Sequence, residues 1–134
     1  MEERKGEAFA GAEQFTVIGR QLQVGDPAPD FCLDYLDLAD RVVRTITLAD
    51  GAGMVRLLSV VNSLGRPACL LVTYQWEAYR ATLPSDACIY TVSRDSPQMQ
   101  AQWQNATGVL HQALSAHCSE QFGQDYGVWL KEWR

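Results

Sequence analysis

The amino-acid sequence predicts a single α/β domain in which helices cover a largely parallel sheet. Three observations lead to this prediction. The chain has 134 residues, of which 47% are hydrophobic and 20% charged, a composition typical of one globular domain. From residue 54 onward, apolar β-branched stretches alternate with stretches whose apolar residues recur at helical spacing. Right-handed crossovers join strands and helices that alternate in this way, and they produce parallel sheets.

The first third of the chain carries only short strand candidates. Residues 1–14 are charged and small, without an apolar period, so we expect a flexible arm there and the folded domain over residues 15–134. Residues 15–24 join a β-branched run to an alternating one and predict a small hairpin. After a turn-rich segment with two prolines, residues 31–36 and 42–48 are the next strand candidates.

The stretch 54–61 is almost continuously apolar and β-branched. A strand covered on both faces has this composition, so we expect it in the centre of the sheet. A helix should follow, with Pro67 near its start and Pro84 just after its end. Helical spacing predicts that its apolar face consists of Val72, Trp76, Tyr79 and Leu83.

The second half of the chain continues the alternation. Residues 87–93 predict a strand, residues 109–115 a third core strand, and residues 119–126 a short helix that Gly127 closes. Between the two strands, Ser96 and Pro97 form a capped helix start. The apolar face of that helix is predicted to consist of Met99, Trp103 and Ala106.

Composition argues against several classes of function. The net charge is −5 and basic residues form no stripe, which argues against nucleic-acid binding. No apolar run approaches the roughly 20 residues of a membrane span, and the charged start lacks a secretory h-region, so we expect a cytoplasmic protein. Two histidines and four singly placed cysteines offer no metal-ligand spacing, and we expect neither a metal nor a cofactor.

Cys69 is the strongest candidate for a reactive residue. It follows the apolar strand and falls in the first turn of the next helix, where the helix dipole stabilises a thiolate. In an open parallel sheet, reactive groups gather at the carboxyl ends of the strands. Arg66 lies three residues upstream and would add a second positive charge. The residues alone leave two interpretations open, a reactive thiolate or a packed cysteine at a helix start.

Several motifs resemble the thiol peroxidase branch of the peroxiredoxins. Residues 24–31 read V-G-D-P-A-P-D-F, similar to the family's entry motif, and residues 58–69 read L-S-V-V-N-S-L-G-R-P-A-C, similar to its active-site loop. Residues 92–97, V-S-R-D-S-P, and residues 122–132, F-G-Q-D-Y-G-V-W-L-K-E, match further stretches at consistent spacing. The resemblance implies a thioredoxin-like fold of the peroxiredoxin type, with an N-terminal β-hairpin. It also implies that the chain lacks the family's last strands and helix, because these follow a K-E-x-R stretch in the family and the matching residues 131–134 are the last of this sequence.

The resemblance implies roles for three loop residues. Cys69 would be the nucleophile that attacks a peroxide, Arg66 its electrostatic activator, and Ser63 a hydroxyl partner. The loop also departs from the family. Asn62 stands where a proline shields the thiolate and Gly65 where an aspartate is usual, and Arg66 itself replaces a threonine that hydrogen-bonds thiolate and peroxide.

The other thiols receive different interpretations. The family's resolving cysteine follows the tryptophan that Trp103 matches, and Gln104 occupies that position here. Cys118 is therefore a candidate substitute resolving thiol. Cys32 and Cys88 lie in predicted strands and are interpreted as packing residues.

Two classes of function remain open at this stage. The first is a thiol-dependent peroxidase that reduces hydrogen peroxide or organic hydroperoxides through a sulfenic acid at Cys69. Its partners would be the peroxide and a thioredoxin-like or low-molecular-weight thiol reductant. The second is a catalytically degenerate thioredoxin-fold module that acts in protein association or redox sensing. The family resemblance also leads us to expect a homodimer.

Overall fold

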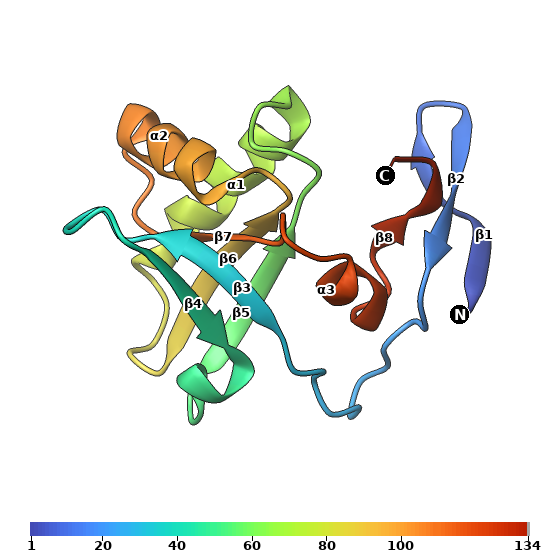
Figure 1. Cartoon of the computed structure of the whole chain (residues 1–134), viewed down its shortest axis with the longest axis horizontal. Coiled ribbons are helices and arrows are strands. Elements are labelled where there is room, and N and C mark those ends of the chain that lie inside the picture. Colours follow the sequence, from blue (N-terminus) through green and yellow to red (C-terminus); the bar gives the residue numbers. More distant parts are fainter. Residues whose placement is uncertain (134) are drawn as a thin grey trace. The chain divides into compact units, whose positions relative to one another are not determined.

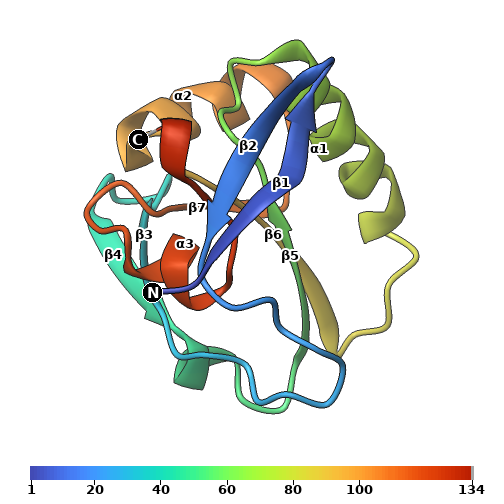
Figure 2. The same cartoon turned by 90° about the vertical axis from the view of Figure 1, so that its right-hand side faces the viewer.

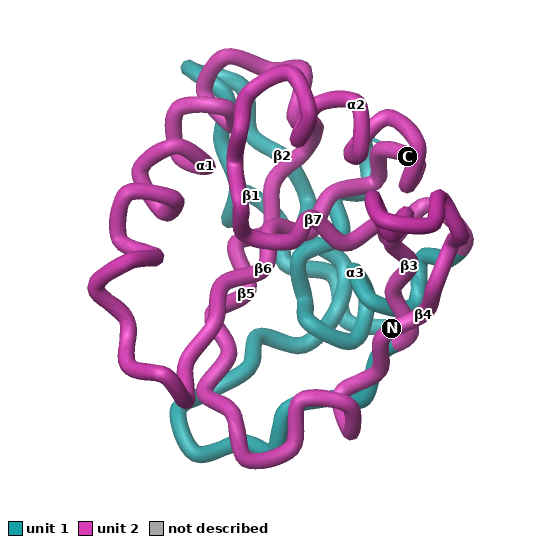
Figure 3. The backbone as a smooth tube through the Cα atoms, turned by 90° about the vertical axis from the view of Figure 1, so that its left-hand side faces the viewer, with its two compact units in different colours: residues 1–31, 119–134 teal, residues 32–118 magenta. Residues whose placement is uncertain are grey.

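A computed structural model describes residues 1–133 of the chain. These residues form two compact units, which Figure 3 distinguishes by colour. Residues 32–118 make up the larger unit, and residues 1–31 together with residues 119–133 make up the smaller one.

The larger unit is built on a five-stranded sheet with the order β4-β3-β7-β6-β5. Strands β5, β6 and β7 run parallel, as the alternating sequence predicts, whereas β3 is antiparallel to both of its neighbours. The sheet is therefore mixed, with a hairpin added to a parallel half. The strands are β3 (Cys32–Leu36), β4 (Val43–Thr47), β5 (Val55–Val60), β6 (Ala87–Ser93) and β7 (Gln112–Ser115).

Two helices connect the parallel strands and lie on one face of the sheet (Figure 1). Helix α1 spans Pro67–Arg80 and helix α2 spans Pro97–Thr107, each with a proline in its first turn. The Ser96 side chain accepts a hydrogen bond from the Met99 amide, which confirms the predicted cap. A short 3₁₀ turn, η1 (Leu48–Gly51), separates β4 from β5.

The expected central position of the strand over residues 54–61 is wrong. Strand β5 is an edge strand, and among residues 1–133 it pairs only with β6. Val55 is 66% exposed and Val60 42% exposed. The core instead centres on the inner strands, where Val92, Ala113 and Leu114 are at most 1% exposed. An apolar β-branched composition does not by itself distinguish a central strand from an edge strand.

The predicted apolar face of α1 is also wrong. Val72 is 39% exposed and Tyr79 60% exposed, while Thr73 is fully buried. The Thr73 hydroxyl satisfies its polarity locally by donating to the Cys69 carbonyl oxygen at 2.7 Å. The helix therefore turns a hydroxyl-bearing side toward the sheet, which a purely hydrophobic periodicity does not find.

Helix α2 buries two glutamines in place of the predicted apolar face. Met99 is 59% exposed, whereas Gln100 and Gln104 are 1% and 6% exposed. Gln100 Nε2 donates to the Leu114 carbonyl oxygen at 2.9 Å, and Gln104 Nε2 donates to the His111 carbonyl oxygen at 3.0 Å. Because these amides bond to the main chain, polar residues can occupy the buried face of α2.

The smaller unit contains a three-stranded antiparallel sheet with the order β1-β2-β8. Strands β1 and β2 form a long hairpin (Figure 2). Gly127 follows the short helix with φ of +65°, as the predicted helix end requires. The elements are β1 (Glu3–Ala10), β2 (Glu13–Ile18), α3 (Gln121–Asp125), β8 (Trp129–Leu130) and the 3₁₀ turn η2 (Lys131–Trp133).

This hairpin corrects the expectation of a flexible arm over residues 1–14, because residues 3–10 form a paired strand. The expected hairpin within residues 15–24 is also wrong. Strand β2 ends at Ile18, and its hairpin partner is β1, with β8 on its other side. Strand β1 is held by charged contacts that local sequence does not reveal. Arg4 donates to the carbonyl oxygens of Gly19 and Gly127 at 2.9 and 2.5 Å, and Lys131 lies 2.7 Å from Glu3.

Aromatic side chains join the two chain segments of the smaller unit. The rings of Phe15 and Trp133 meet edge to face with centroids 4.7 Å apart, and those of Phe31 and Phe122 meet edge to face at 6.1 Å. The Tyr126 hydroxyl donates to the Pro29 carbonyl oxygen at 2.7 Å. Segments from both ends of the chain thus share one core. In residues 1–133, no helix has the length and apolar character that a membrane crossing requires.

Candidate active site at the start of helix α1

Cys69 lies in the first turn of α1, as the sequence predicts. The chain leaves β5 at Val60, forms a short loop and enters the 14-residue helix at Pro67. Cys69 is partly buried, and no acidic residue occupies the first turn of the helix. The thiol therefore lies beside the unpaired backbone N–H groups of the first turn and the positive end of the helix dipole.

A single carboxylate fastens the loop that precedes Cys69. Asp95 Oδ1 accepts from the Ser63 hydroxyl at 2.8 Å, and Asp95 Oδ2 accepts from the Leu64 amide at 2.8 Å. Asp95 lies just after β6, the strand next to β5. The carboxylate thus bridges the carboxyl ends of two parallel strands and fixes the approach to α1.

Asp95 is held in turn by the neighbouring elements. Ser93, at the end of β6, donates its hydroxyl to Asp95 Oδ2 at 2.8 Å and receives a bond from Gln100 Nε2 at 2.9 Å. The Ser115 hydroxyl at the end of β7 donates to the Asp95 carbonyl oxygen at 2.5 Å. The loop before Cys69 is therefore connected to β6, β7 and α2 through one network, and such networks stiffen a site.

Of the residues that the sequence singled out, Arg66 and Ser63 lie in the loop before Cys69, whereas Gln104 does not. Arg66 is the N-cap of α1, with extended backbone angles and a side chain that does not cap the helix, so it adjoins the first turn. The Ser63 hydroxyl donates to Asp95 and accepts from the Gly65 amide at 3.2 Å. Gln104 lies on α2 and contacts the main chain just before β7, away from the carboxyl ends of the strands.

Asp95 is a site residue that the sequence analysis missed. Residues 92–97 contributed only to the family match and to the predicted helix cap. A usable signal was present, because the carboxyl ends of β5 and β6 must meet at one edge of a parallel sheet. A carboxylate after β6 therefore had to lie near the loop that follows β5.

Cys118 occupies a polar environment of its own. Its Sγ lies 3.1 Å from His117 Nε2 and donates toward Asp34 Oδ2 at 3.6 Å. Desolvation raises the pKa of the Cys118 thiol, and the hydrogen bond and negative charge of Asp34 raise it further, so the thiolate is disfavoured. Cys32 is exposed on β3, which corrects its interpretation as a packing residue, and Cys88 is half-buried on β6.

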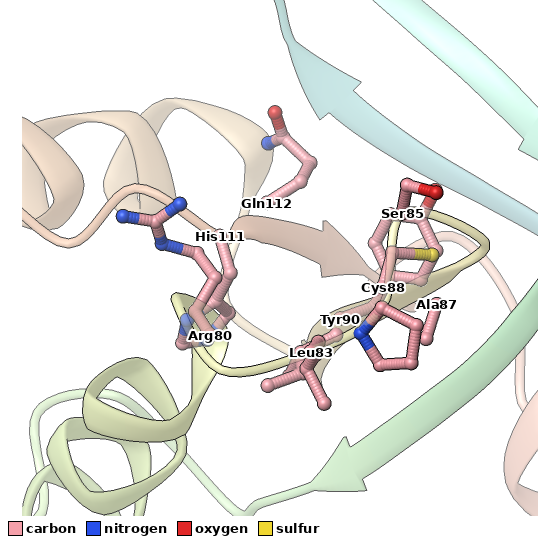
Figure 4. A pocket seen from close by; sticks show the side chains of 10 residues that line it. Arg80, Leu83, Ser85, Ala87, Cys88, Tyr90, His111 and Gln112 are labelled. Carbon is pink, nitrogen blue, oxygen red and sulfur yellow. The ribbon is translucent and has the colours of Figure 1, made fainter.

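The cavity in Figure 4 is separate from the Cys69 region. It has a volume of about 320 Å³ and lies where the end of α1 meets the first residues of β6 and β7. Its lining includes Arg80, Cys88 and His111, which the close-up shows around the opening. Cys69, in contrast, follows the carboxyl end of a strand, so the two lie at opposite edges of the sheet.

His111, at the edge of this cavity, should make folding sensitive to mild acid. Its side chain is 2% exposed; Nε2 pairs with the Thr91 hydroxyl at 2.8 Å, and Nδ1 is 3.5 Å from Glu77. Burial lowers the pKa of His111, although the Glu77 carboxylate acts against this shift. The unfolded chain then binds a proton that the folded chain resists. We therefore expect the free energy of unfolding to fall as pH drops below about 6.5, the ordinary value for histidine.

Chemical denaturation between about pH 7.5 and 5.5 measures this dependence. His111→Gln should flatten the pH dependence, because it removes the group that the folded state keeps neutral. His117→Gln serves as the matched control at a histidine whose side chain is 35% exposed. Equal slopes for the parent chain and His111→Gln would contradict the assignment.

A partly buried thiol at a helix start, connected by a short loop to the preceding parallel strand, is the arrangement found in thioredoxin-fold thiol proteins. Solved structures agree with this class. A thiol peroxidase from Chromobacterium violaceum matches with a TM-score of 0.76 at 23% identity, covering 90% of this chain and 67% of that one. A peroxiredoxin-like protein from Aquifex aeolicus matches with a TM-score of 0.75 at 22% identity and the same coverage. These similarities show the thioredoxin-like fold of the peroxiredoxins.

Sequence comparison is more specific. The chain is 36% identical over 120 residues to a thiol peroxidase of Bacillus subtilis, which covers 89% of this chain and 68% of the relative. It is 38% identical over 119 residues to a thiol peroxidase of Streptococcus sanguinis, with 88% and 69% covered. No family model matches the chain. On the strength of these relatives, the chain belongs to the thiol peroxidase family.

Proposed function

We propose that this protein is a thiol-dependent peroxidase and that Cys69 is its nucleophile. The Cys69 thiolate attacks the terminal oxygen of a hydroperoxide and supplies two electrons to the O–O bond. The bond breaks, the sulfur becomes a sulfenic acid, and the alkoxide or hydroxide takes up a proton to leave as alcohol or water. Hydrogen peroxide and organic hydroperoxides both fit this reaction.

The position of Cys69 is the observation that carries the proposal. The thiol lies in the first turn of a 14-residue helix, where the dipole favours the thiolate that the reaction needs. Arg66, at the N-cap, is assigned as the electrostatic activator of thiolate and leaving oxygen. The Ser63 hydroxyl donates a hydrogen bond to Asp95. We therefore assign Ser63 to positioning of the loop and not to direct contact with peroxide.

An external thiol regenerates the enzyme in this proposal. Gln104 stands at the position of the family's resolving cysteine and is bonded within the larger unit. The thiol of Cys118 donates toward Asp34, and its raised pKa makes it a poor attacking group near neutral pH. Two equivalents of a small thiol, or one thioredoxin-like dithiol, would reduce the sulfenic acid and release water. The proposal includes a cytoplasmic location, where such reductants are maintained, and a homodimer.

Stopped-flow mixing of the reduced protein with hydrogen peroxide tests the proposal. We expect peroxide consumption at least about 100-fold faster than with free cysteine, because the helix dipole and the fixed loop stabilise the reacting charge. Cys69→Ser should abolish the fast phase. Cys32→Ser, which removes an exposed thiol from β3, is the matched control and should retain it.

Mass spectrometry of the oxidised protein checks the regeneration step. We expect a dimedone adduct on Cys69 and no Cys69–Cys118 disulfide. A rate equal to that of free cysteine would overturn the peroxidase proposal. It would favour the alternative of a degenerate thioredoxin-fold module in association or redox sensing, with which the altered residues Asn62, Gly65 and Arg66 are consistent.

A further inference from the structure

Three side chains of different chemistry converge beside strand β3. Asp34 lies on β3 and pairs with Ser115 of β7, and the chain continues from Ser115 through a turn to His117 and Cys118. Asp34 Oδ2 is 3.6 Å from His117 Nε2 and 3.6 Å from Cys118 Sγ. His117 Nε2 and Cys118 Sγ are 3.1 Å apart. Each residue thus offers one ligand-type atom to a common point.

These spacings suit a tetrahedral metal ion. With Zn–S of about 2.3 Å and Zn–N and Zn–O of about 2.0 Å, the edges between ligand atoms are about 3.3–3.6 Å. The two distances from Asp34, both 3.6 Å, match those edges, and the 3.1 Å between His117 Nε2 and Cys118 Sγ would lengthen slightly when an ion replaces the thiol proton. One thiolate, one neutral imidazole and one carboxylate also carry two negative charges, which balance a divalent cation. From these residues we propose that Asp34, His117 and Cys118 form a zinc site, with its fourth position open to water.

The cluster is held in place by its surroundings. Asp34 Oδ1 accepts from the Thr45 hydroxyl at 2.8 Å, which fixes the carboxylate and leaves Oδ2 directed at the cluster. The His117 amide donates to the Ser115 hydroxyl oxygen at 3.3 Å, and Ser115 is itself bonded to the Asp95 carbonyl oxygen. Supporting bonds of this kind orient metal ligands and raise affinity.

The site is accessible to an ion from solvent. The side chains of His117 and Asp34 are 35% and 22% exposed, and Cys118 is exposed. A nitrogen, sulfur and oxygen donor set favours zinc over magnesium or calcium, which prefer oxygen ligands alone. The site is distinct from Cys69 and from the cavity in Figure 4, because none of its residues belongs to either.

Zinc titration tests this site. The full chain is reduced with a phosphine, freed of metal and then titrated with zinc chloride. Calorimetry should give one zinc ion per chain, and native mass spectrometry should show one bound ion for each chain in the species observed. Cobalt substitution should add a thiolate charge-transfer band and strong visible bands, the signature of tetrahedral coordination. Asp34→Asn, His117→Gln and Cys118→Ser should each weaken zinc binding about tenfold or more, and Thr45→Val about tenfold through the carboxylate it holds.

Cys32→Ser is the matched control, since it removes an exposed thiol from the same strand as Asp34 and should leave affinity unchanged. Circular dichroism of each variant establishes that it is folded. Absence of zinc binding to the parent chain would overturn the proposal. So would binding that survives both Asp34→Asn and His117→Gln, which would indicate a lone thiolate, or one zinc ion shared by two chains.

Discussion

Asp95→Ala should lower the free energy of unfolding by about 3–4 kcal/mol and slow the reaction of Cys69 with peroxide about tenfold or more. The substitution removes the acceptor of three hydrogen bonds, from the Ser63 hydroxyl, the Leu64 amide and the Ser93 hydroxyl. Leu64 as a whole is 4% exposed, so water cannot easily replace the lost acceptor of its amide. The loop between β5 and α1 would then no longer be fixed in place, and the start of α1 with Cys69 would shift.

Asp95→Asn provides a graded comparison. The amide keeps one oxygen for the Leu64 amide and offers an N–H₂ group that the Ser63 hydroxyl oxygen can accept. We therefore expect its stability and rate to lie between those of the parent chain and Asp95→Ala.

Asp86→Ala is the matched control, an exposed carboxylate before β6 at the opposite edge of the sheet. Urea denaturation and stopped-flow peroxide consumption measure the two effects. A parent-like rate for a folded Asp95→Ala would contradict the assigned role of the loop.

Gly19→Ala should destabilise the smaller unit by about 3–5 kcal/mol. Gly19 has φ of +106°, which L side chains rarely adopt, and an added Cβ would lie 2.2 Å from the Gln124 carbonyl oxygen and 3.0 Å from Gly127 Cα. Both contacts are with backbone, which has no rotamer through which to move aside. The substitution would therefore separate the residue after β2 from the end of α3 and the turn that follows it.

Gly11→Ala isolates the effect of this close approach. Gly11 also has a positive φ, of +63°, but nothing lies within 4 Å of an added Cβ. It should cost only about 1 kcal/mol, the backbone penalty alone. Thermal unfolding and hydrogen exchange of the β2 amides compare the two variants. Equal losses of stability in Gly19→Ala and Gly11→Ala would show that the close approach at Gly19 contributes nothing to the stability of the smaller unit.

The elements that the sequence predicted best are those with local signals. Strand β6 and the capped start of α2 at Ser96 fall where alternation and helix-cap chemistry place them. Strand β1 was missed because its support is remote, from Lys131 to Glu3 and from Arg4 to Gly127. Composition alone predicted a central position for β5, because composition records apolar character but not the number of neighbouring strands.

In the candidate site, too, local sequence predicted one residue but not the contacts between distant residues. Cys69 could be placed from one strand, one loop and one helix start in sequence. Asp95 contacts residues 31 and 32 positions earlier, and Asp34 meets Cys118 across 84 positions, so only the folded sheet reveals these contacts. The buried sides of α1 and α2 were missed for a related reason. A buried glutamine or threonine finds its partner in the structure, not in hydrophobic periodicity.

The two buried glutamines of α2 have a consequence for how this chain can vary. Gln100 and Gln104 bond to the carbonyl oxygens of Leu114 and His111, and every amino acid carries that oxygen. The attachment therefore does not depend on the type of side chain at Leu114, on β7, or at His111, just before β7, provided that the chain keeps its path. The helix has no such freedom, because few other side chains reach the same oxygens with an N–H group. This contact therefore restricts the side chains of the helix, whereas Leu114 on the strand is restricted by packing, because it is fully buried.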